Sequence, residues 1–202
     1  DVLKAASDAG ADAVLVHHGY FWKNEGPQIT GIKRARISHL MEHGMSLLAY
    51  HLPLDAHPVF GNNAQLGQLL GFQVDDWFGE QNVAAVGRLL QPMTLQRLAG
   101  VVEEKLRRQP LVVGDESATI RRIAWCSGAA QDYLSTAVDL GVDAFLTGEV
   151  SEHTVHLARE SGVAFIAAGH HATERYGVQA LGMHLAQQFG LKHQFIEIEN
   201  PV

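Results

Sequence analysis

The sequence predicts an α/β fold with a largely parallel core sheet. Short apolar runs that are typical of buried strands alternate with amphipathic helical patterns along the whole chain. Glycines end several of the helical patterns, as at Gly71 and Gly190. The chain has 202 residues, of which 47% are hydrophobic, which is enough to build one well-packed domain or two small ones.

The expected strands are short and mostly apolar, and turn residues or helical patterns lie between them. Runs of this kind are typical of strands that a sheet buries on both faces. They cover residues 13–16, 46–51, 83–90, 111–113, 122–126, 144–147, 163–168 and 194–198.

The expected helices carry apolar residues three or four positions apart. Thr94 is a suitable N-cap for one of them. Pro53 and Pro58 interrupt the stretch after the second strand, so residues 51–58 are predicted to form a rigid loop instead of a continuous helix. Residues 19–31 are predicted to form a loop rich in aromatic residues, glycine and proline. The helices cover residues 1–10, 32–43, 62–70, 94–108, 130–140, 151–160 and 173–189.

Two stretches from the first part of the sequence recur later in the chain. Gly10–Val16 matches Gly141–Thr147, and His51–Gly71 aligns without gaps on His170–Gly190. Chance similarity between two βα units is the alternative explanation. The gapless match, with its shared spacing from histidine to acid, favours a true repeat.

A repeat of this kind predicts two structurally related βα halves, residues 1–71 and 115–202, joined by residues 72–114. We expect a pseudo-twofold axis between the halves. Because α/β proteins place their sites at the carboxyl ends of strands, ligands from both halves should converge on a site between them. The chain starts at Asp1 inside a helical pattern, so we also expect an N-terminal segment of the full protein to precede it.

Three short motifs after predicted strands contain histidine, and two of them also contain a carboxylate. Imidazole and carboxylate are ligands of catalytic transition-metal sites. Side chains alternate along a strand, so the adjacent His17 and His18 should point to opposite sides and reach two different ions. A bridging carboxylate would complete a dinuclear centre. The motifs are Val16–Gly19, His51–Asp55 and His170–Glu174.

Each motif also has a structural alternative. His17 and His18 could be a hydrogen-bonded pair at the mouth of a strand. Asp55 could cap a turn or a helix, and Glu174 could stabilise the first turn of a helix through a capping box or the helix dipole. His51 could orient a ligand, bind metal or act as an acid or base. The occurrence of all three motifs in one chain favours the metal site.

Three further features are less specific. Glu149 could contact a ligand or cap the helix that begins near Ser151. The aromatic stretch Gly19–Lys23 could stack on a ring-shaped substrate or pack against another subunit. Cys126 ends a buried strand and has no Cys or His at ligand spacing, so we interpret it as structural.

The composition excludes several classes of function. A net charge of −7 argues against nucleic acid as a partner, because such binding needs Lys and Arg to neutralise phosphates. An anionic small molecule is compatible, since bound metals reverse the local charge. The only cysteine is Cys126, so no intrachain disulfide can form, and a reducing cytosol fits. No apolar run is long enough to span a bilayer. We therefore expect a cytoplasmic protein without a membrane partner.

The motifs also carry a resemblance to a known family. The strings VLVHHGYFWK, YHLPLDAHP-x2-GNNAQLG, LTGEVSEHTVH and AAGHHATERYGVQAL resemble the bacterial YbgI proteins. Those proteins are GTP cyclohydrolase I type 2 homologues and are related to the Nif-three-like proteins of eukaryotes. The resemblance runs over essentially the whole chain.

The resemblance implies two metal ions bridged by Glu174, and a toroidal homohexamer whose metal sites face an internal cavity. The family position after the last ligand histidine is often tyrosine, and here it is His171, which leaves the role of that residue open. Residues 72–114 are too few for the domain that longer members insert, so the chain resembles a short-form member. The ligands carried over are His17, His18, Asp55, His170 and Glu174.

The motifs and the resemblance lead to the hypothesis of a two-metal hydrolase that acts on a nucleotide. The family name implies opening of the purine ring of GTP by metal-activated water. His51 or His171 could shuttle protons near neutral pH. The alternatives are a metal-dependent phosphoesterase and a non-catalytic metal-binding or regulatory scaffold. The ligand set admits Zn, Fe, Mn or Co, so the two divalent ions stay unidentified.

Overall fold

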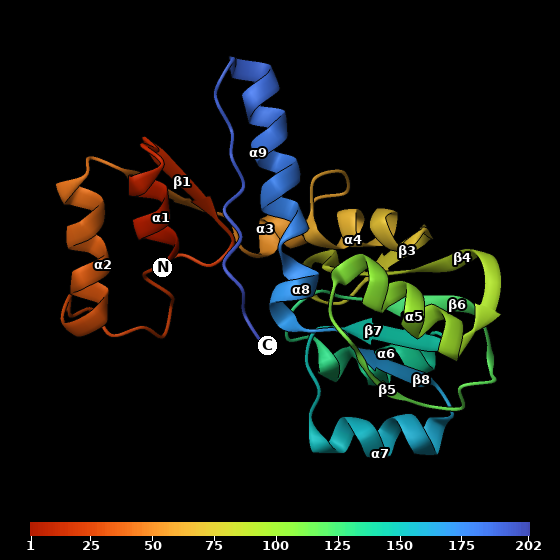
Figure 1. The fold of residues 1–202 in the computed structure, drawn as a ribbon. Coiled ribbons are helices and arrows are strands. Elements are labelled where there is room, and N and C mark those ends of the chain that lie inside the picture. The colour runs from red at the N-terminus through yellow and green to blue at the C-terminus, as the bar shows by residue number, and fades with distance from the viewer.

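The chain forms two sheets that lie side by side, with α9 projecting between them (Figure 1). The computed structural model describes residues 1–202. The smaller sheet pairs β1 (Ala13–Val16) with β2 (Ser46–Ala49) in parallel. The helices α1 (Val2–Asp8) and α2 (Gly31–Glu42) accompany this sheet.

The larger sheet has six strands in the order β3-β4-β6-β7-β8-β5. The central strands β6, β7 and β8 run parallel, as predicted, whereas β3, β4 and β5 are added antiparallel, so the larger sheet is mixed. The α/β class predicted from the sequence is confirmed. The bounds are β3 (Phe72–Phe78), β4 (Ala84–Thr94), β5 (Leu111–Val113), β6 (Thr119–Trp125), β7 (Ala144–Thr147) and β8 (Ala164–Ala167).

Helices cover both faces of the larger sheet. On one face, α4 and α5 pack over a cluster that contains the fully buried Trp125 and Leu146. On the other face, α6 and α7 pack over Phe145 and Phe165. Adjacent residues of β7 thus serve opposite faces, which explains why its sequence is apolar throughout. The bounds are α4 (Asn62–Leu70), α5 (Leu95–Leu106), α6 (Leu134–Asp139) and α7 (Glu152–Ser161).

Local signals in the sequence set several helix ends. The side chain of Thr94 accepts a hydrogen bond from the backbone N–H of Arg97 at 3.3 Å and caps α5, as predicted. Gly71 and Gly190 adopt left-handed conformations and end α4 and α9 (Tyr176–Phe189). None of the helices is both long and apolar enough to cross a membrane.

Two short helices replace predicted elements near the centre of the molecule. Residues 51–58 are not a loop throughout, because Leu52–Asp55 forms the one-turn helix α3. Pro53 is tolerated there, since backbone N–H groups in the first turn have no helical partner to lose. The predicted helix over residues 173–189 is divided at Arg175, and its first part belongs to α8 (His170–Glu174). Glu174 therefore ends a short helix and does not open a long one.

Three more expectations differ from the structure. The edge strand β3 was not predicted, because Gln73, Asp75 and Asp76 interrupt its apolar pattern. The predicted strand over residues 194–198 is absent, and this segment returns beside α9 without regular structure. The predicted helix over residues 130–140 begins with a 3-10 turn, η2 (Gln131–Tyr133); a second such turn, η1 (Glu80–Asn82), precedes β4.

The elements that the sequence repeat relates are similar in kind. The pairs β1–β2 and β7–β8 each join four residues in parallel. After β2 and after β8 the chain forms a short helix, α3 or α8, and then a longer helix ended by a left-handed glycine. These facts agree with the predicted repeat. The pseudo-twofold axis and the boundaries at residues 71 and 115 stay predictions.

Two helical glycines should respond oppositely to substitution by alanine. A Cβ on Gly67 in α4 would lie 2.7 Å from Cζ2 of Trp125, so Gly67→Ala should lower the free energy of unfolding by about 1–3 kcal/mol through overpacking. A Cβ on Gly100 in α5 would meet nothing within 4 Å, so Gly100→Ala should raise it by about 0.5–1 kcal/mol. Urea denaturation of both variants measures the difference, and a stabilised Gly67→Ala protein would contradict the close packing of α4.

Candidate metal centre

Histidines and carboxylates from three parts of the chain meet where the two sheets face each other. The ends of β1, α3 and α8 place them there, and α3 and α8 lie in the middle of the molecule (Figure 1). The structure thus brings together residues that are far apart in the sequence. They are His17 and His18 after β1, His51 and Asp55 at the two ends of α3, and His170 and Glu174 at the two ends of α8.

The carboxylate of Glu174 lies at the centre of this cluster. Its Oε1 atom is 3.5 Å from Nε2 of His17. Its Oε2 atom is 3.2 Å from Nε2 of His18 and 2.8 Å from Nε2 of His170. Asp55 approaches Nε2 of His17 from the other side, at 3.2 Å through Oδ2. The two oxygens of Glu174 therefore face different histidines.

Three groups of side chains within this cluster could hold a metal ion. Glu174 belongs to two of these groups, once with His17 and Asp55 and once with His18 and His170. The third group joins His51 to His17 and His18. Of the two groups that contain a carboxylate, one includes His17 and the other includes the adjacent His18, and both include Glu174.

The buried Nε2 atom of His17 is better placed to bind a cation than to form a hydrogen bond. Nε2 of His17 is shielded from solvent and makes no hydrogen bond of acceptable geometry, although the oxygens of Asp55 and Glu174 lie within 3.5 Å. A buried nitrogen without a partner is costly. A ring nitrogen and two carboxylates that converge within 3.5 Å, in geometry that suits hydrogen bonds poorly, are a suitable donor set for a divalent ion.

Further contacts fix how the clustered side chains point. Nδ1 of His17 lies 2.9 Å from the carbonyl oxygen of Tyr50, and Nδ1 of His170 lies 2.6 Å from Oε1 of Glu149. Each contact leaves the other ring nitrogen, Nε2, directed at the cluster, as is usual for histidines that bind metal. Glu149, for which the sequence left two roles open, therefore orients His170.

Asn62 was missed by the sequence analysis. Its side chain is fully buried; Nδ2 donates to Oδ1 of Asp55 at 2.9 Å, and Oδ1 accepts the backbone N–H of Gly177 at 2.8 Å. This amide ties the carboxylate of Asp55 to the first turn of α9. The available signal was a polar pair, Asn62 and Asn63, at the start of an amphipathic helix, and that signal does not distinguish a cap from a buried link.

The two histidines considered as proton carriers lie in different surroundings. The ring of His51 has its centroid 4.9 Å from that of His17 and 5.1 Å from that of His18, within the cluster. His171 lies outside it, with Nε2 2.6 Å from Oε1 of Glu197, a carboxylate that also pairs with Arg175.

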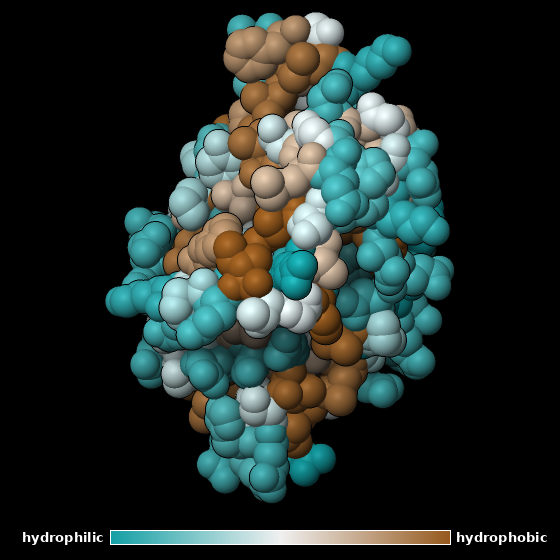
Figure 2. Space-filling model, turned by 90° about the vertical axis from the view of Figure 1, so that its left-hand side faces the viewer, coloured by the Kyte–Doolittle hydropathy of each residue, from teal (hydrophilic) through white to brown (hydrophobic).

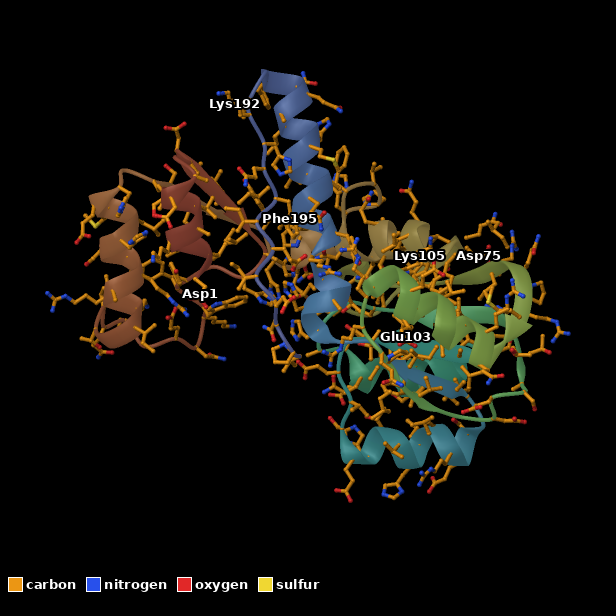
Figure 3. All side chains as sticks on the ribbon, viewed as in Figure 1. Asp1, Asp75, Glu103, Lys105, Lys192 and Phe195 are labelled. Carbon is orange, nitrogen blue, oxygen red and sulfur yellow. The ribbon has the colours of Figure 1, made fainter.

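A cavity of about 460 Å³ opens beside the cluster. Three residues of the cluster, His18, His170 and Glu174, line this cavity together with His171 and Arg175. The segment after α9 also lines the cavity, mostly with apolar side chains, and Figure 3 shows the labelled Phe195 on this segment beside α9.

The charges in the cluster depend on one another when no metal is bound. Burial lowers the pKa of His17, but the carboxylates of Asp55 and Glu174 outweigh it and raise the pKa to about 9. At His170 the carboxylate of Glu174, the largest cause, together with that of Glu149, outweighs the lowering by burial and raises the pKa to about 9. Burial acts to raise the pKa of Glu174, and His17 and His170 overcome this and lower it to about 2.

His18 and His51 behave differently. Burial lowers the pKa of both rings, and neighbouring imidazoles add to the effect. These two histidines are therefore neutral at pH 7, with ring nitrogens that can accept an ion or a proton.

Comparisons with known proteins agree with this fold. The model of the Duf34/NIF3 (NGG1p interacting factor 3) family matches residues 1–201. Proteins named GTP cyclohydrolase 1 type 2 homolog from Allochromatium vinosum and Escherichia coli are 55% and 50% identical to this chain. Each match covers 99% of this chain, and 79% and 81% of the two relatives.

Solved structures are similar as well. The structure of protein ybgI, described as of unknown function, has a TM-score of 0.94 and 48% identity over all of this chain and 81% of its own. A Thermus thermophilus protein has a TM-score of 0.87 and 31% identity over all of this chain and 80% of its own. The chain belongs to the Duf34/NIF3 family.

Proposed function

We propose that the protein is a dinuclear metal-dependent hydrolase that acts on a nucleotide. The observation that carries this proposal is the position of Glu174, whose two oxygens face separate sets of histidines. One ion would be held by His17, Asp55 and Glu174, and the other by His18, His170 and Glu174, with Glu174 bridging. The name carried by the relatives, GTP cyclohydrolase 1 type 2 homolog, supports a purine nucleotide as the substrate.

The chemistry divides between the ions and the side chains around them. Divalent ions in such a site supply a water nucleophile at neutral pH and a Lewis acid for the group under attack. His51 is neutral and makes no side-chain hydrogen bond, so one of its ring nitrogens can take up a proton as C8 of the purine is attacked. His171 and Arg175 on the cavity wall can contact an anionic part of the substrate or pass a proton.

Purified protein loaded with Zn, Mn or Fe and incubated with GTP distinguishes this function from its alternatives. Formate release indicates opening of the purine ring. Release of inorganic phosphate without formate indicates a phosphoesterase, which the same two-metal centre would suit. Tight binding of two ions without any turnover indicates a metal-binding or regulatory scaffold. Elemental analysis of the protein as purified identifies the ion to use.

Replacing Glu174 with glutamine should abolish dinuclear binding. An amide lacks the charge that offsets two adjacent cations and is a poor bridge between them. We expect metal content to fall from two ions per chain to one or none, with an unchanged circular dichroism spectrum. The matched control is Glu152→Gln, which removes an exposed carboxylate from the first turn of α7 and should leave two ions. Two ions per chain in Glu174→Gln would exclude the bridging role.

Metal binding should release protons at pH 7. With pKa values near 9, His17 and His170 carry protons in the metal-free protein, and an ion must displace them. Apparent affinity should therefore rise with pH up to about pH 9. Calorimetry in buffers of different ionisation enthalpy should count about two protons released per chain. His153→Gln, which alters an exposed histidine paired with Asp132, should not change this number. Binding without proton release would mean that His17 and His170 are not ligands.

We also infer that the chain assembles into a toroidal homohexamer. Large apolar side chains are exposed towards the far end of α9, with Met183 52%, Phe189 66% and Leu191 59% accessible. Figure 2 shows apolar residues at this projecting end, at the top of the molecule. Exposed patches of this kind mark contact surfaces. Light scattering at micromolar concentration should give about six times the 22.0 kDa of one chain, and a monomer would contradict the inference.

A further inference from the structure

Trp22 lies against the candidate metal centre, although it belongs to none of the groups that could hold an ion. The centroid of its indole ring is 4.7 Å from that of His51, and the rings meet edge-to-face at 84°. It lies 5.9 Å from the ring of His18. Trp22 is 44% exposed and the side chain of His18 is 45% exposed, so the indole borders solvent beside the centre.

The surrounding loop holds Trp22 in this position. Nε1 of Trp22 donates to the carbonyl oxygen of Gly19 at 3.1 Å, and its backbone N–H donates to Oε2 of Glu25 at 3.2 Å. Lys33 on α2 pairs with the other oxygen of Glu25 at 3.2 Å. The polar edge of the indole is thereby satisfied within the loop. The remaining exposed surface of the ring is apolar and aromatic.

The neighbouring aromatic residue serves a different purpose. Phe21 is 65% exposed, and its ring lies under Nζ of Lys33 at 4.5 Å. Its backbone N–H also bonds to Glu25. Phe21 thus belongs to the contacts that shape the loop, whereas Trp22 contacts the histidines. Two adjacent exposed aromatic residues with different surroundings provide a matched pair for comparison.

We propose that Trp22 forms an aromatic wall of the substrate site and stacks on the planar heterocycle of the substrate. This proposal rests on the proposed function, which it extends by assigning the residue that recognises the ring. A flat ring placed against the indole would lie next to His18 and His51, within reach of ions held by His18. A second subunit packed on Trp22 would instead cover His18 and restrict access to the centre. Stacking on an aromatic side chain is a common means of binding a base.

The test compares a ligand that has the ring with one that lacks it. Dissociation constants of GTP and of inorganic triphosphate are measured by calorimetry on zinc-loaded protein. Trp22→Leu keeps an apolar side chain without a π face and should weaken GTP binding about ten-fold or more. Trp22→Phe should stay within about three-fold of the wild type, as should the control Phe21→Leu. Triphosphate binding should be the same in all four proteins. GTP should also change the indole emission of the wild type and not that of Trp22→Phe.

Several results would overturn the proposal. Unchanged GTP affinity in Trp22→Leu would show that the indole does not bind the base. A loss of GTP affinity in Phe195→Ala would then place the base in the cavity beside α9. Equal losses for GTP and triphosphate would mean that Trp22 supports the site as a whole. A smaller assembly in Trp22→Leu would make it a subunit contact. If the wild type binds two ions but no GTP, both this proposal and the nucleotide substrate fail, whereas the metal centre stands.

Discussion

The carboxylate of Glu174 is the group on which the arrangement of the centre depends. Its side chain is only 10% exposed, and an ionised carboxylate taken out of water is strongly unfavourable unless positive charge compensates for it. In the metal-free protein the protons on His17 and His170 supply that charge, which is why the pKa of Glu174 lies near 2 and those of the two histidines near 9. Metal ions would replace these protons in the same positions.

This compensation requires the two sheets to be held together. His17 follows the small sheet, whereas His170 and Glu174 follow the large one. Asn62 joins the two sides, because its buried amide contacts Asp55 at one end and the backbone of Gly177 at the other. Gly128 contributes by having no side chain: it has a φ of +68°, and a Cβ there would collide with the carboxylate of Glu174. Small and buried residues thus decide where the charged ones can lie.

The sequence predicted the class of the fold and the residues of the cluster because both leave local patterns. Short apolar strands followed within a few residues by histidine, and glycines after helices, can be read one segment at a time. The edge strand β3 could not be read in this way, since an edge strand needs apolar residues on one face only and Asp75 and Asp76 disguise it. The contacts of the Tyr50 carbonyl with His17 and of the Asn62 amide with Asp55 were not predictable either, because no spacing of residues in the sequence indicates them. The different surroundings of His51 and His171 were not predictable for the same reason: His51 lies among the imidazoles of the cluster, whereas His171 pairs with Glu197.

The separation of these contacts along the chain has a consequence for the order of events during biosynthesis. The link between Asn62 and Gly177 spans 115 residues, and His17 meets Glu174 only after nearly the whole chain has been made. Long-range contacts of this kind form late, because the entropy of closing the intervening chain must first be overcome. A nascent chain that ends before α8 holds His17, His18 and Asp55 but lacks the shared carboxylate. Any ion that needs Glu174 as a ligand could therefore bind only after α8 has been made and the two ends of the chain have met.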